Sequence, residues 1–234
     1  LVNAVGMDVI PTDVVAALAS EGLPDVLDLK IAIAVKGSLS RGTLRSAAGV
    51  VGSGGMAVVD GRRVREPALG EAWDAPFPPP LGTQRCLSLP LADLVTAPRT
   101  TGCRNLRVYG RLVPLPLPVA RLTGHALRVL GAGPARAVID RLAAVLPEGP
   151  GEEVRRTGGF TVVAEARSRG GTTRRAWMTG PEPYLFSGIS AALCAKWAAE
   201  PSFDKVGALS PVQAFGAHRL RDALAAQGVT TGIA

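Results

Sequence analysis

The stretch Gly6-Met7-Asp8-Val9-Ile10-Pro11-Thr12-Asp13, with the apolar run 14–19 behind it, decides how the start of the chain folds. The short apolar run 1–5 in front of it is typical of a strand end. Gly6 permits a tight turn, while Pro11 fixes φ and disfavours helix at the residue before it. The pattern predicts a strand end, a turn and a helix that begins after Pro11.

Two carboxylates, Asp8 and Asp13, bracket this turn. Thr12 can cap the helix by accepting a hydrogen bond from a first-turn amide, and Asp13 places negative charge at the positive end of the helix dipole. One interpretation of the segment is therefore purely structural. The other is that it contacts a ligand, because α/β enzymes bind ligands where strands end and helices start.

Composition indicates a globular protein without a nucleic-acid-binding surface. The chain has 234 residues, of which 47% are hydrophobic and 19% charged, enough to bury a sizeable core. Its net charge of +7 could favour anionic partners, but the arginines are scattered and aromatic residues make up only 4%. Basic residues interleaved with base-stacking aromatics are absent, so we expect a solvated arginine-rich surface and no nucleic acid partner.

Cysteine and histidine usage argues against a metal site. Cys86, Cys103 and Cys194 are odd in number and widely spaced, which is typical of reduced thiols in a cytoplasmic protein. With only His125 and His218, neither a histidine-based metal site nor a Ser-His-Asp triad is expected. No apolar run reaches the ~18 to 20 residues of a membrane-spanning helix, which predicts a soluble protein.

Alternating and helical patterns continue along the chain. We expect strands at 29–35, 86–91 and 106–109, and hairpins at 57–64 and 160–178. Helices are expected within 37–48 and over 92–97, 135–146, 186–199 and 211–228, and an irregular loop or lid anchored by Trp73 and Phe77 at 67–80. The proline-broken segment 114–136 suits a lipid pocket mouth, a peripheral membrane contact or a packed crossover. Together these signals predict an α/β (α+β) fold, a mixed and largely antiparallel sheet with helices on one face.

Hydroxyl side chains mark three further candidate positions. Ser40 and Thr43 lie in a segment dense in glycine and hydroxyls, which could line a substrate or phosphate pocket or could form only a tight strand–helix junction. Thr101 follows a predicted short helix, and Tyr184 precedes a long apolar one. Tyr109, inside a predicted strand, is the better candidate for the core.

The ordered motifs resemble one family. The opening turn, the segment Ser40-Arg41-Gly42-Thr43, the loop at Thr101, Gly180-Pro181-Glu182-Pro183-Tyr184 and the closing Ser210-Pro211-Val212-Gln213-Ala214-Phe215-Gly216 are similar to motifs of saccharopine-dehydrogenase-like oxidoreductases, which include the trans-acting enoyl reductases. This resemblance implies that 1–234 is the C-terminal substrate and dimerisation domain. Residues 1–20 and 208–234 would pack towards an N-terminal Rossmann domain, whose Gly-rich loop is absent from this sequence.

The resemblance also implies a function. The full-length protein would be an NAD(P)-dependent oxidoreductase that reduces a lipid or polyketide intermediate as a homodimer, and this chain alone would be inactive. Asp8 and Tyr184 would be catalytic, Gly6, Thr12 and Asp13 would contact a cofactor, NADP or NAD, held mainly by the other domain, and Ser40, Thr43 and Thr101 would contact the substrate. A non-catalytic lipid-binding or protein-interaction module is the alternative, because the dinucleotide loop is missing.

Overall fold

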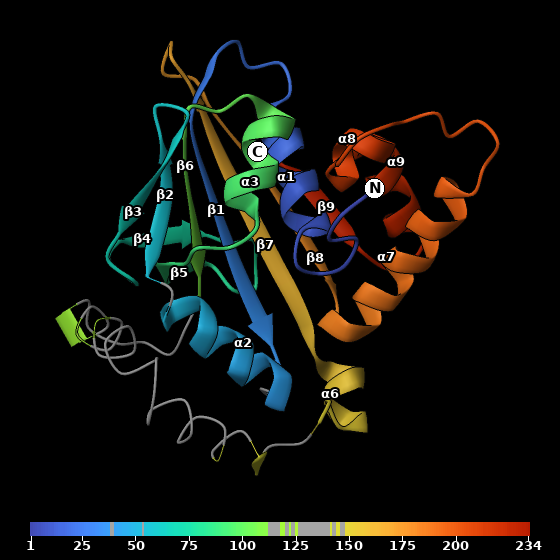
Figure 1. Ribbon diagram of the computed structural model, residues 1–234, viewed down its shortest axis with the longest axis horizontal. Helices are drawn as coiled ribbons and strands as arrows, with labels where there is room; N and C mark the ends of the chain where they lie inside the picture. The colour runs from blue at the N-terminus through green and yellow to red at the C-terminus, as the bar shows by residue number, and fades with distance from the viewer. Residues whose placement is uncertain are drawn as a thin grey trace.

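A computed structural model shows one sheet with helices packed on it (Figure 1). It describes residues 1–37, 40–52, 54–111, 118–119, 122, 125, 141, 144–145 and 148–234, without the side chains of residues 43, 44, 47, 48, 51 and 52. The strands are β1 (Val26–Lys36), β2 (Gly55–Val59), β3 (Arg62–Glu66), β4 (Ala72–Pro76), β5 (Thr83–Ser88), β6 (Asn105–Gly110), β7 (Gly159–Ser168), β8 (Thr173–Pro181) and β9 (Thr230–Ile233). The helices are α1 (Ile10–Ser20), α2 (Arg41–Gly52), α3 (Asp93–Thr101), α6 (Glu152–Thr157), α7 (Pro183–Ala198), α8 (Pro211–Phe215) and α9 (Ala217–Ala225).

The sheet is mixed but mostly antiparallel, which confirms the predicted fold class. Its main order is β3-β2-β6-β1-β7-β8-β9, and β5, paired with β4, also joins β6. Of the pairings among described strands, β1 with β6 is parallel, with Ile31 opposite Val108. On its other side β1 pairs antiparallel with β7, the longest pairing in the sheet. Strand β1 is thus central, and its carboxyl end points towards α2 (Figure 1).

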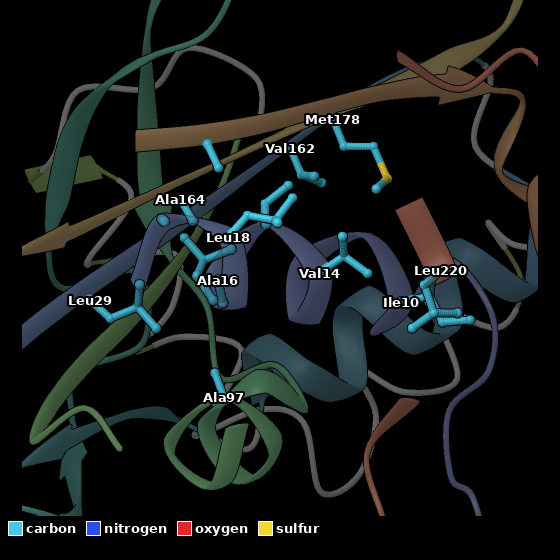
Figure 2. Packing of buried hydrophobic residues seen from close by; sticks show 14 of the residues in the cluster. Ile10, Val14, Ala16, Leu18, Leu29, Ala97, Val162, Ala164, Met178 and Leu220 are labelled. Atoms are coloured by element: carbon cyan, nitrogen blue, oxygen red, sulfur yellow. The ribbon is translucent and has the colours of Figure 1, made fainter. Parts of the chain in front are cut away.

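Helix α1 lies at the centre of the main core (Figure 2). Its side chains Ile10, Val14 and Leu18 are at most 1% exposed. They pack against the large alternate side chains of β1, such as Leu29 and Ile31, together with residues of β7, β8, α3 and α9. Helices α1, α3, α7, α8 and α9 lie on the same side of the sheet in Figure 1. The expected alternation of β1 and the placement of helices on one face are confirmed.

The other face of the sheet carries a smaller core. Ala32 and Ala34 of β1 contact a cluster that includes Phe77 and Tyr109, with Trp73 packed against it. The predicted irregular loop at 67–80 was wrong over 72–76, which form β4, paired with β5. Trp73 and Phe77 do anchor the segment. The sequence did not indicate a strand at 72–76, because this short run is surrounded by prolines. The run is a strand because it forms backbone hydrogen bonds with β5.

Two local predictions about the first half of the chain need correction. Helix α1 begins at Ile10 rather than after Pro11, so Thr12 lies inside its first turn and donates to Val9 O (2.9 Å) instead of capping the helix. The predicted loop at 99–102 continues α3 up to Thr101, and Gly102 ends the helix with a φ of 72°. The run 1–5 forms only an isolated bridge, between Val2 and Leu209.

The first residues of the chain lie beside the segment that precedes α8. Asn3 N donates to Leu209 O (3.2 Å), and Leu209 N donates to Leu1 O (3.0 Å). The predicted helix 211–228 is divided at Gly216 into α8 and α9, and β9 follows, a strand that the pattern did not predict. The expected packing of 1–20 and 208–234 towards another domain stays a prediction. The predicted helix at 135–146 and the segment 114–136 fall almost wholly outside the described residues.

Candidate functional site

The structure brings together two hydroxyls from distant motifs. The Oη of Tyr184, in the first turn of α7, lies 2.7 Å from the Oγ of Ser40, which directly precedes α2. Ser40 is buried (2% exposed), whereas Tyr184 is 51% exposed. The half-exposed side chain of Tyr184 is therefore positioned at its hydroxyl by the buried hydroxyl of Ser40.

The start of α7 fixes the position of Tyr184. The Glu182 carboxylate accepts hydrogen bonds from Tyr184 N (2.9 Å) and Leu185 N (3.0 Å), and Pro183 occupies the first turn. This cap satisfies amides that would otherwise be orphaned and keeps negative charge at the positive end of the helix. The sequence analysis missed Glu182, although an acid before Pro183 is a helix-start signal.

The opening turn packs against the same helix. Met7 N donates to Ser187 Oγ (3.0 Å), and Ser190 Oγ donates to Val5 O (2.8 Å). A Cβ at Gly6 would lie 3.1 Å from Ser187 Oγ, so a side chain here would push on Ser187, whereas the φ of Gly6 is not positive. Asp8 is exposed beside this contact. The predicted catalytic residues Asp8 and Tyr184 thus come from two segments that touch.

Two predicted cofactor residues are enclosed by the chain itself. Thr12 and Asp13 are both 0% exposed. The Asp13 carboxylate accepts from Thr100 Oγ1 (2.6 Å) and from Val212 N (2.9 Å) at the start of α8. Burial raises the pKa of Asp13, and these two donors oppose that rise. A cofactor could reach Thr12 or Asp13 only if the neighbouring helices moved.

Thr101 lies away from the Tyr184–Ser40 pair. Its Oγ1 donates to Ala97 O (2.7 Å) and accepts from Cys103 N (3.2 Å), contacts that close the end of α3. It lines a groove of about 260 Å³ whose walls include Glu21 and His218. The groove lies beside the last turns of α1. The opening turn contacts α7 at the other end of α1, just before its first turn. The side chain of Thr43 is outside the described part of α2.

The polar side chains of this groove are less suited to proton transfer than the Tyr184 hydroxyl. Two of the groove's hydroxyls are already used, because Thr100 donates to Asp13 and Thr101 to a carbonyl. The hydroxyl of Ser20 is enclosed and has no hydrogen-bond partner among the described residues. His218 Nε2 lies 2.8 Å from the Glu21 carboxylate, and both side chains are half exposed. We therefore assign the candidate site to Tyr184 and Ser40.

Other reactive side chains are disfavoured. The three cysteines are free and buried, and burial raises the pKa of Cys86 and of Cys194 to about 11, so their thiols stay protonated. Tyr109 is 2% exposed, and burial raises its pKa to about 12, as suits a core residue. Within the described ranges, no cluster of three metal-ligating side chains occurs and no helix is long and apolar enough to cross a bilayer.

Comparison with known proteins gives a distant likeness of fold to solved structures. No protein-family model matches the sequence, and no curated protein does. Among solved structures, the chain is similar to the apo form of histidine-tagged saccharopine dehydrogenase (L-Glu forming) from Saccharomyces cerevisiae, with a TM-score of 0.49 and 10% identity over 90% of this chain and 67% of that one. At this identity and TM-score no residue role is carried across.

Proposed function

We propose that this chain is the substrate-facing domain of an NAD(P)-dependent oxidoreductase and that the Tyr184 hydroxyl supplies the proton of the reduction. The observation that carries the proposal is the 2.7 Å contact between Tyr184 and Ser40, which are 144 residues apart. Each belongs to a separate motif that resembles saccharopine-dehydrogenase-like oxidoreductases. Their meeting is the arrangement expected if both motifs serve one site.

The local chemistry suits proton delivery. A reduction of this kind adds a hydride to one atom of a double bond and a proton to the other, and the nicotinamide supplies the hydride. When Tyr184 gives up its proton, negative charge develops on its oxygen. Ser40, already within hydrogen-bonding distance, can donate to that oxygen and stabilise the charge. The Glu182 cap holds the tyrosine backbone still during this step.

The starts of helices α1, α7 and α8 do not suit the phosphates of a dinucleotide. Those of α7 and α8 are capped by Glu182 and by Ser210 with Asp13, and the first turn of α1 is buried. A pyrophosphate needs free amides at a helix start and no competing carboxylate. This supports a division of labour in which another domain binds the dinucleotide and this one handles the proton.

The family resemblance extends the proposal to the substrate and the assembly. We assign the substrate to lipid- or polyketide-like intermediates with a conjugated carbon–carbon or carbon–oxygen double bond, with NADPH as reductant. We also assign a homodimeric state. These finer statements rest on the quoted motifs and not on a contact in the structure.

The test is Tyr184→Phe in the protein that joins this chain to a dinucleotide-binding domain, assayed by NADPH oxidation with a panel of enoyl thioesters and ketones. We expect kcat/KM to fall by roughly 10²- to 10⁴-fold, because the general acid is lost, with an unchanged Tm. Ser40→Ala should lose about 10-fold or more, the value of a hydrogen bond to a charged group.

The matched control is Tyr109→Phe, a tyrosine in the core on the opposite face of the sheet. It should leave kcat/KM unchanged even if stability falls. Wild-type turnover by Tyr184→Phe would remove this residue from the mechanism. No NADPH oxidation by the wild type with any member of the panel would favour the alternative, a non-catalytic module.

A further inference from the structure

Three helices meet around two buried carboxyl groups. Asp13 of α1 and Asp93, the first residue of α3, are both 0% exposed, and the start of α8 closes the cluster. The two acids are close enough that the charge of Asp13 raises the pKa of Asp93. Two charges at this depth would be costly, so their partners decide which acid is ionised.

Asp13 has the partners of an anion. It accepts from the Val212 amide, which can only donate, and from Thr100 Oγ1. Thr100 Oγ1 also lies 3.0 Å from Ser210 Oγ, which can supply the remaining hydrogen. A carboxylate is therefore the form of Asp13 that these donors stabilise.

Asp93 has the opposite surroundings. Throughout the part of the chain that the structure describes, neither of its carboxyl oxygens has a hydrogen-bond partner. Thr96 Oγ1, one turn further along α3, is also enclosed and without a partner. Thr12 faces Asp93 from α1, but its single hydroxyl proton already goes to Val9 O. The nearby hydroxyl oxygen can accept a proton from Asp93 and has none left to give.

We propose that Asp93 holds its proton at mildly acidic pH and is a pH-sensitive latch between α3 and the first turn of α1. In the protonated form, the neutral carboxyl tolerates burial beside the Asp13 carboxylate and can donate to Thr12. Loss of the proton places a second negative charge in the cluster. Release of the N-terminal end of α3 into water is then the least costly response.

The electrostatics around Asp93 support this assignment. Burial is the largest effect and raises its pKa to about 7, from 3.8 when it is solvated. The Thr12 hydroxyl and the Asp93 backbone amide oppose this rise in pKa, and the charges of Asp13 and the exposed Asp8 add to it. Because the folded state binds this proton more tightly than the unfolded state, the contribution of Asp93 to stability is fully present below about pH 4. It falls as pH rises from about 4 to 7, and the loss is complete above that range.

The latch connects two regions of the molecule. At its far end, α3 carries Thr100 and Thr101, which line the groove beside α1 and α9. At its N-terminal end, Asp93 of α3 is close enough to the opening turn that the charge of Asp8 acts on its carboxyl group. Loosening of α3 at alkaline pH would therefore change the groove and the turn together, with α7 left in place.

Hydrogen exchange of the whole chain tests the latch. After correction for the intrinsic pH dependence of exchange, protection of the α3 amides should fall roughly tenfold or more between pH 5.5 and 8.5, while that of α7 changes less. Asp93→Asn, which cannot ionise, should keep α3 protected across this range. Asp204→Asn, an exposed control, should behave as the wild type does.

A direct titration covers the case in which the Asp93→Asn variant fails to fold. The ¹³C resonance of the Asp93 carboxyl in the wild type should titrate with a midpoint near neutrality. A midpoint below pH 5, or α3 protection that is independent of pH in the wild type, would overturn the proposal. So would an Asp93→Asn variant whose α3 protection falls with pH as the wild type's does.

Discussion

At the scale of single residues, Gly6 carries the contact between the opening turn and α7. The turn comes so close to the helix that a Cβ here would lie 3.1 Å from Ser187 Oγ and 3.3 Å from Ser187 Cβ. Its φ is not positive, so crowding against Ser187, and not backbone conformation, is what disfavours a side chain. The same approach lets Ser187 accept from Met7 N, which positions Asp8 next to the helix that carries Tyr184.

We predict that Gly6→Ala lowers the free energy of unfolding by about 1 to 3 kcal/mol, the usual cost of overpacking. Urea denaturation measures this loss. Gly49→Ala in α2 is the matched control, because a Cβ there meets nothing within 4 Å. It should be neutral or stabilising by about 0.5 to 1 kcal/mol, since alanine favours helix. Equal effects of the two substitutions would show that the turn is not held against α7.

At the scale of elements, Asp13 joins three helices. It belongs to α1, accepts from Thr100 of α3, and accepts from Val212 N in the first turn of α8. Helix α8 also has its own capping box, formed by Ser210 and Gln213. Because α8 has only five residues, its stability depends on such partners more than on its own hydrogen bonds.

We predict that Asp13→Ala destabilises the protein by about 3 kcal/mol or more, because it leaves buried donors on α3 and α8 unpaired. Ser210→Ala should cost about 1 kcal/mol, the typical value of a helix cap. Urea unfolding of both variants separates a carboxylate that joins helices from a simple cap. A smaller loss for Asp13→Ala than for Ser210→Ala would contradict this role for Asp13.

Sequence patterns predicted the strands and helices in which apolar residues recur with a clear strand or helix period. The periodic apolar residues of β1, β7 and α1 produced correct predictions, as did the Asp60-Gly61 turn between β2 and β3. Strand β9 was missed because Thr-Thr-Gly-Ile carries little β signal. Gly232 is required there by the Trp177 ring, which a Cβ would approach to 2.4 Å. Local propensity contains no information about such a neighbour.

The candidate site was predictable only in part, for the same reason. Tyr184 and Ser40 could be chosen from their motifs, but their contact depends on where α2 and α7 begin, after strands β1 and β8 that pair with opposite edges of β7. Thr12 and Asp13 have the residue types of an exposed helix start, yet α3 and α8 bury them. Asp93 follows no recognisable motif. Its isolation from polar partners becomes visible only when the three helices are placed together.

At the scale of the whole molecule, the sheet separates two environments. Helices α1, α3, α7, α8 and α9 cover one face around the main core, and the β4–β5 hairpin covers part of the other (Figure 1). The opening turn and the Tyr184–Ser40 pair both involve the start of α7, on the helical side. This side is where we expect a cofactor-binding domain to approach.

The last prediction follows from this layout. We expect the chain by itself to bind NADPH negligibly, because the first turn of α1 is buried and the starts of α7 and α8 are occupied by the chain's own caps. The same chain joined to a dinucleotide-binding domain should bind it in the micromolar range that enzymes commonly show.

Isothermal titration calorimetry compares the two proteins directly. The net charge of +7 will attract any polyanion weakly, so each titration is repeated at higher salt, where such non-specific attraction is screened. Micromolar binding to the isolated chain that persists at high salt would mean that it holds the dinucleotide itself. The division of labour proposed here would then be wrong.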